Sequence, residues 1–135
     1  MNVYVVEDSA SIRERLAEMV TDIGATVAGE AAEPADAVQG ILETRPDSVI
    51  LDLQLDGGSG LDVLRAVHPS HPEILFITVT NFPNAQYRRS CLAAGATHFL
   101  DKNTEFSRVR DVLRELAPSL ADARHASFLH PRTLP

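Results

Sequence analysis

The 135-residue sequence contains a single cysteine, Cys91, so no disulfide can form within the chain. No apolar stretch approaches about 20 residues, the length that a membrane-spanning helix needs. The first residues also lack the basic leader and apolar segment of a signal peptide. These absences favour a protein of the reducing cytoplasm, where disulfides are rare, without a membrane partner.

Basic residues are also scarce. The sequence has 12 lysines and arginines against 19 aspartates and glutamates, which gives a formal net charge of −7. Because nucleic acids are bound mainly through cations that contact phosphates, an acidic chain without a basic stripe is a poor binder of DNA or RNA. The hydrophobic content of 44% and the charged content of 23% are typical of a globular domain, and the length suits one domain.

The sequence does contain an alternation of short apolar runs with segments of helical period. We expect strands at about 3–6, 26–30, 48–52, 74–79 and 97–101. A helix follows each strand; the first is capped by Ser9 and ended by Gly24, and the fourth runs from about 84 to 94. Five such units predict an α/β fold, a doubly wound parallel sheet with helices on both faces.

The last expected helix carries an apolar side that is typical of packing on a sheet, made of Phe106, Val109, Leu113 and Leu116. Beyond it the sequence has three prolines and scattered apolar residues. We therefore expect one domain over residues 1–117 and a flexible C-terminal tail over 118–135.

Polar side chains stand where the expected strands end. Glu7 and Asp8 follow the first strand, Asp52 ends the third, Thr80 ends the fourth and Lys102 follows the fifth. In a parallel sheet these ends lie at one edge, so the side chains would meet in one crevice. Carboxylates about 5 Å apart repel by about 3 kcal/mol at an effective dielectric of about 20, and Mg²⁺ would relieve that repulsion. The set therefore suits a divalent cation and a phosphoryl group carried on a carboxylate.

The segments around these residues resemble the receiver domain of two-component response regulators. The resemblance covers about residues 1–116 and rests on six short segments in order: Val5–Ser9, Ile50–Leu53, Gly60-Leu61, Thr78–Asn81, Gly95-Ala96 and Phe99–Lys102. Each segment is a weak signal alone, whereas their order and spacing together are specific. The resemblance implies a flavodoxin-like sheet of five parallel strands in the order 2-1-3-4-5.

The resemblance also implies chemical roles. Asp52 would be the phosphoacceptor, taking a phosphoryl group from a phosphohistidine, while Lys102 and Thr80 would contact phosphoryl oxygens. Mg²⁺ would be held by acidic side chains and one backbone carbonyl, namely Glu7 through a water molecule, Asp8, Asp52 and the carbonyl of Gln54. The protein would be a signalling phosphoprotein rather than an enzyme, although it would catalyse its own phosphorylation and dephosphorylation.

A switch and a set of partners are implied as well. Thr80 would move on phosphorylation, and Phe99 would rotate inward with it to change the output face, which would include Tyr87, Arg88 and residues of 105–116. The expected donor is a sensor histidine kinase or a histidine phosphotransfer protein. Because no DNA-binding region follows the domain in this sequence, we expect a stand-alone receiver that acts through a further, unknown protein.

Three positions depart from the pattern of the family or tune its chemistry. Asn103 stands after Lys102 where many receivers have proline, so this loop need not contain a cis bond. Gln54 and Phe82 flank the expected phosphoryl group, where the family tunes dephosphorylation. We expect bulky Phe82 to hinder the hydrolytic water and lengthen the phosphorylated lifetime.

Two other functions remain as alternatives. A receiver-like interaction module that works without phosphorylation would share the fold, although the complete polar set argues against it. An aspartyl-phosphate hydrolase also has an aspartate after an apolar strand, but its second aspartate is replaced here by Gln54, and the sequence leaves no room for a cap domain.

Overall fold

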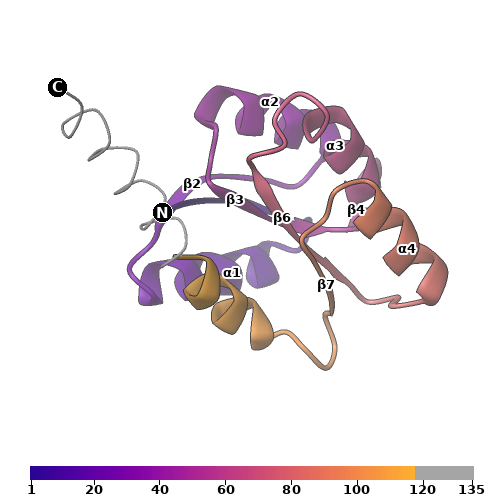
Figure 1. Ribbon diagram of the computed structural model, residues 1–135. Helices are drawn as coiled ribbons and strands as arrows, with labels where there is room; N and C mark the ends of the chain where they lie inside the picture. The colour runs from indigo at the N-terminus through magenta and orange to yellow at the C-terminus, as the bar shows by residue number, and fades with distance from the viewer. Residues whose placement is uncertain (118–135) are drawn as a thin grey trace, which may run out of the picture.

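The computed structural model describes residues 1–117, which form a five-stranded parallel sheet between two layers of helices (Figure 1). The strands are β1 (Asn2–Val6), β2 (Thr26–Ala31), β3 (Ser48–Asp52), β6 (Leu75–Thr80) and β7 (His98–Asp101). They lie in the order β2-β1-β3-β6-β7. Counted along the chain this order is 2-1-3-4-5, which confirms the doubly wound, flavodoxin-like sheet. The segment 118–135, expected to be a flexible tail, lies outside the described residues.

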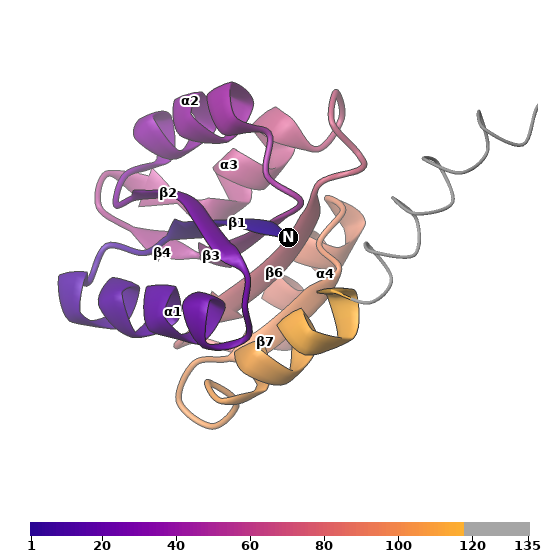
Figure 2. The same cartoon turned by 90° about the vertical axis from the view of Figure 1, so that its left-hand side faces the viewer.

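The helices divide between the two faces of the sheet. They are α1 (Ala10–Asp22), α2 (Pro34–Thr44), α3 (Gly60–Val67), α4 (Ala85–Ala93) and a helix over 108–117. Figure 2 shows α1 and the helix over 108–117 beneath one face, with α2 and α3 on the other. None of the helices within residues 1–117 is long and apolar enough to cross a membrane.

The ends of the first and fourth helices follow the expected local signals. The Ser9 hydroxyl accepts a hydrogen bond from the N–H of Ile12 at 3.4 Å and caps α1. Gly24 and Gly95, which follow α1 and α4, have φ angles of +82° and +110°, a region that glycine enters without steric cost.

The core has two parts because successive residues of each strand point to opposite faces. Val3 and Val5 of β1 pack in the cluster with α1 and the helix over 108–117. Tyr4 and Val6 pack in the cluster with α2, α3 and α4. Since both faces are covered, the strands read as continuous apolar runs rather than as alternating ones.

A small antiparallel hairpin follows β3, at a position where the sequence predicted no strand. It pairs β4 (Gln54–Leu55) with β5 (Gly58–Ser59). The N–H of Gly60 then donates to the carbonyl of Leu53 at 3.1 Å. A Cβ at Gly60 would collide with the backbone carbonyl of Asp52. Glycine at this position therefore lets α3 begin directly against the end of β3.

We predict that Gly60→Ala lowers the free energy of unfolding by about 1–3 kcal/mol, the usual cost of forcing extra atoms into a packed site. Urea denaturation measures the change. Gly58→Ala is the matched control, because its Cβ would lie 3.0 Å from Cγ of Pro34, a less severe contact. Equal losses in the two variants would contradict the role given to the close approach at Gly60.

Candidate functional site

The carboxyl ends of four neighbouring strands carry the polar side chains that the sequence grouped together. Glu7 directly follows β1, Asp52 ends β3, Thr80 ends β6 and Lys102 follows β7. The backbone ties the last two together, because the N–H of Lys102 donates to the carbonyl of Thr80 at 2.8 Å. Residues that lie 22 to 95 positions apart in the sequence thus share one edge of the sheet, as parallel strands require.

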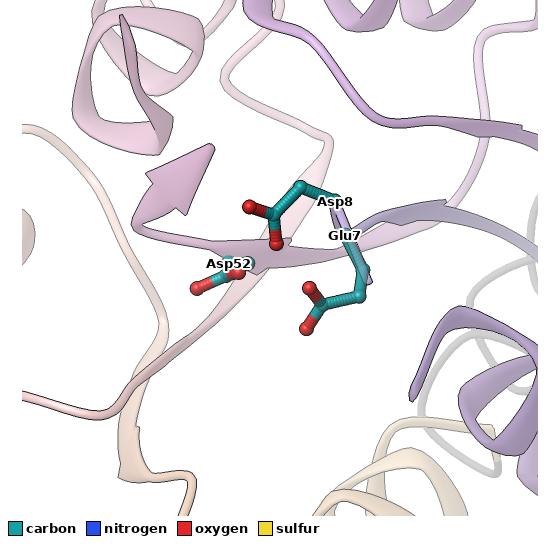
Figure 3. Close-up of side chains that lie close together, drawn as sticks. All are labelled: Glu7, Asp8 and Asp52. Carbon is teal, nitrogen blue, oxygen red and sulfur yellow. The ribbon is translucent and has the colours of Figure 1, made fainter. Parts of the chain in front are cut away.

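Three carboxylates form the centre of this edge. Oxygen atoms of Glu7, Asp8 and Asp52 all lie within 4.8 Å of one another (Figure 3). Glu7 is fully buried and Asp52 is 1% exposed, whereas Asp8 is half-buried. Closely spaced carboxylate oxygens with one accessible member fit a hard divalent cation such as Mg²⁺, which binds few carboxylates and retains water ligands.

Lys102 supplies the opposing charge. Its Nζ lies 2.5 Å from Oε1 of Glu7 and 3.1 Å from Oδ2 of Asp52, and the residue is 9% exposed. The other oxygen of Asp52, Oδ1, accepts a hydrogen bond from the N–H of Gln54 at 3.1 Å. Asp52 is therefore held from two sides, while one ammonium pairs with two of the three carboxylates.

This environment changes the proton affinities of the groups. Burial raises the pKa of Glu7 to about 7, a hydrogen bond with Asp8 adds to the rise, and Lys102 opposes it. Burial likewise raises the pKa of Asp52 against the opposing charge of Lys102. Burial alone would lower the pKa of Lys102, but hydrogen bonding to Glu7 and the charge of Asp52 raise it overall. A proton on the Glu7 carboxyl would therefore relieve part of the excess negative charge as pH falls through neutrality.

Thr80 and Phe99, the expected switch residues, are both buried. The hydroxyl of Thr80 donates to Oε1 of Gln54 at 3.0 Å and accepts the N–H of Phe82 at 3.0 Å. Phe99 is 8% exposed and packs in the core cluster on the side of α4. The expected inward rotation of Phe99 stays a prediction, and it would start from a ring that is already largely covered.

Two contacts at the site were absent from the sequence-based expectations. The side chain of Gln54, expected to flank the phosphoryl group, binds the Thr80 hydroxyl. The Arg13 guanidinium on α1 donates to the backbone carbonyl of Glu7 at 2.8 Å. Neither contact has a sequence signal, because each depends on how a long side chain is oriented in the folded protein.

The loop after Lys102 agrees with the expectation from its sequence. The described peptide bonds are all trans, including the bond before Asn103. The side-chain amide of Asn103 donates to the carbonyl of Asn81 at 3.4 Å and so joins the loops that follow β7 and β6.

Comparison with known proteins agrees with this geometry. The response regulator receiver domain family matches residues 3–114. The chemotaxis protein CheY of Thermotoga maritima is 29% identical over 115 residues, which cover 85% of this chain and 96% of CheY. The response regulator GacA of Pseudomonas viridiflava is also 29% identical over 115 residues, but the match covers 84% of this chain and 54% of GacA. The chain thus corresponds to about half the length of GacA.

Solved structures of other proteins have the same fold as this chain. The response regulator domain of Thermotoga maritima CheB superposes with a TM-score of 0.75 at 26% identity, covering 85% of this chain and 91% of that domain. The fold and the acidic edge of the sheet define a receiver-type signalling domain. The chain belongs to the response regulator receiver domain family, as its match to that family over residues 3–114 establishes.

We predict that the metal-free protein loses stability as pH rises from about 5.5 to about 8. The Glu7 carboxyl holds a proton up to a pKa of about 7 in the folded state, against an ordinary value of 4.5. The folded state therefore binds more protons than the unfolded state in this window, so the free energy of unfolding falls with rising pH and levels off above it. The melting temperature should fall by at least about 4 °C, the shift that roughly 1 kcal/mol produces in a small domain.

Thermal melting of Glu7→Gln and of Glu14→Gln, an exposed position on α1, tests this assignment. The pH dependence should largely disappear in the first variant and persist in the second. Retention of the full dependence in Glu7→Gln would show that another group is responsible.

Proposed function

We propose that this receiver domain signals through phosphorylation of Asp52, with a sensor histidine kinase or a histidine phosphotransfer protein as donor and Mg²⁺ as cofactor. The observation that carries the proposal is the environment of the Asp52 carboxylate. It lies beside two further carboxylates and 3.1 Å from the Lys102 ammonium. The single cysteine is in keeping with phosphoryl transfer to Asp52 in the reducing cytoplasm.

The chemistry requires little of the protein beyond position and charge. A carboxylate oxygen of Asp52 forms a bond to phosphorus while the bond from phosphorus to the histidine nitrogen breaks. That nitrogen keeps the electron pair and takes up a proton. Lys102, which pairs with Asp52 beforehand, stays close enough to neutralise a phosphoryl oxygen.

Mg²⁺ would neutralise the remaining charge on the phosphoryl oxygens. Its ligands would be oxygen atoms of the acidic edge, namely Asp8, Asp52 and the backbone carbonyl of Gln54, with Glu7 acting through water. Because Asp8 is the half-buried member of the set, it would give the ion a route from solvent.

The change in output would begin at the Thr80 hydroxyl, which can donate a hydrogen bond to a phosphoryl oxygen. Phe99 of β7 would transmit the change to the face formed with α4 and residues of 105–116. A further protein would bind this face. A receiver-like module that acts without phosphorylation is the second candidate, and labelling separates the two.

We predict that acetyl phosphate with Mg²⁺ adds the mass of one phosphoryl group to the wild-type chain and none to Asp52→Asn. Intact-protein mass spectrometry measures the addition. Asp56→Asn, an exposed aspartate in the turn of the following hairpin, is the matched control and should be labelled like the wild type. Failure of the wild type to take up phosphate would favour the module that works without phosphorylation.

We also predict that Phe82→Ala shortens the phosphorylated lifetime several-fold. Phe82 follows Thr80 by two residues and its side chain is 61% exposed, so truncation leaves the core intact. Without the ring, water would reach the phosphoryl group more easily. The decay of labelled protein after removal of the donor gives the rate, and an unchanged rate would refute the shielding role.

A further inference from the structure

A chain of hydrogen bonds joins the hairpin after β3 to the start of α4. Oε1 of Gln54 accepts the Thr80 hydroxyl at 3.0 Å, and the oxygen of that hydroxyl accepts the N–H of Phe82 at 3.0 Å. The carbonyl of Phe82 accepts the N–H of Asn84 at 2.9 Å, and Asn84 caps α4 through the N–H of Tyr87. The Gln54 side chain, which has no part in the proposed chemistry, therefore begins a route that passes through Thr80.

The Thr80 hydroxyl has one proton to donate, and this limits its partners. Its oxygen already accepts the N–H of Phe82, and the proton is directed to Gln54. A phosphoryl oxygen on Asp52 can receive that proton only if the bond to Gln54 breaks. The two arrangements of Thr80 are therefore mutually exclusive.

We propose that the Gln54 side chain is a positioning residue that holds Thr80 in its unphosphorylated arrangement by competing with the phosphoryl group for the Thr80 hydroxyl. The proposal deepens the phosphorylation switch and rests on the proposed function. It concerns the side chain of Gln54 alone, since the backbone carbonyl is a candidate metal ligand and is unaffected by substitution.

The second polar atom of the amide bears on how firmly Gln54 holds Thr80. Nε2 of Gln54 is buried and has no hydrogen-bond partner among residues 1–117. A buried donor without an acceptor destabilises the arrangement that contains it. The unpaired Nε2 thus partly offsets the stabilisation that the hydrogen bond from Thr80 provides. A charged phosphoryl oxygen is a stronger acceptor than an amide oxygen and can therefore displace Gln54.

The burial of Thr80 makes the competition consequential. Thr80 is fully buried, and its carbonyl accepts a hydrogen bond from the N–H of Lys102 at 2.8 Å. The backbone of Thr80 is therefore bonded to the residue that supplies the ammonium of the site. The hydroxyl can exchange partners by rotation of the side chain, whereas the backbone stays in the sheet. A change of partner would be felt first at the N–H of Phe82.

The experiment measures binding of beryllofluoride, a mimic of the phosphoryl group, at saturating Mg²⁺ by calorimetry. Gln54→Met keeps the length of the side chain but removes the acceptor, and Thr80→Val removes the donor. We expect Gln54→Met to bind beryllofluoride roughly 2- to 10-fold more tightly than the wild type, the range that loss of one neutral hydrogen bond allows. The double variant should bind like Thr80→Val alone, because Gln54 acts only through Thr80.

Two further measurements separate this role from a general loss of structure. With the Thr80 methyl group labelled, its NMR signal in unliganded Gln54→Met should shift toward the position seen in the beryllofluoride complex. Mg²⁺ affinity should be unchanged, since the backbone carbonyl of Gln54 remains. Asp56→Asn, in the turn of the same hairpin, should bind beryllofluoride like the wild type. Gln54→Leu, which also lacks an acceptor, serves if Gln54→Met does not fold.

Each other outcome overturns the proposal in a distinct way. Unchanged or weaker binding by Gln54→Met would show that Gln54 does not oppose the switch. An equal effect of Gln54→Met in the Thr80→Val background would mean that Gln54 contacts the phosphoryl mimic directly. If the wild type itself fails to bind beryllofluoride with Mg²⁺, the proposed function fails and the competition at Thr80 fails with it.

Discussion

The excess of negative charge at one edge of the sheet is the constraint on which the rest of the site depends. Glu7 and Asp52 are removed from water by the fold itself, and Asp8 lies within reach of both. The ammonium of Lys102 pairs with Glu7 and Asp52. Such an arrangement is costly without further positive charge, because buried carboxylates lose solvation and repel one another. The site can lower that cost by taking up a proton or a divalent cation. In the proposed function a phosphoryl group would add more negative charge, so its stability on Asp52 would depend on the cations that the same carboxylates attract.

The scaffold holds these charges at fixed positions because few of its parts can move independently. Each functional residue lies at the end of a strand that is covered on both faces. The close approach of Gly60 to the backbone of Asp52 leaves no space for a side chain between β3 and α3. Motion is therefore more accessible to side chains and loops than to the sheet. Thr80 illustrates this division, since its backbone N–H···O bond to Lys102 is fixed in the sheet while, in the proposed switch, its hydroxyl would exchange partners by rotation of the side chain.

Much of this architecture could be predicted from the sequence, because each strand is marked by the residues within it. The five strands of the sheet begin and end within one residue of their expected positions, because burial on both faces produces continuous apolar runs such as 48–52. Parallel topology alone places Glu7, Asp52 and Lys102 at one edge of the sheet, whereas their contact also depends on the strand order. The strand order could not be derived from periodicity and came from family resemblance. The β4–β5 hairpin was missed because strands of two residues carry no periodic signal, and the contact between Gln54 and Thr80 was missed because it depends on side-chain conformation.

The features that could be predicted concern the chemistry of the site, whereas the contact that could not be predicted concerns its regulation. The carboxylates and the lysine act through charge, which tolerates small changes of position, so their residue types and spacing suffice to identify them. Gln54 acts through one neutral hydrogen bond at 3.0 Å, which requires a particular side-chain length and direction. A receiver could therefore exchange the residue at this position without losing its phosphoacceptor chemistry. Such an exchange would alter the free energy difference between the two arrangements of Thr80. If the proposed function holds, the hairpin after β3 would set how strongly phosphorylation changes the protein, while the phosphoacceptor site would stay the same.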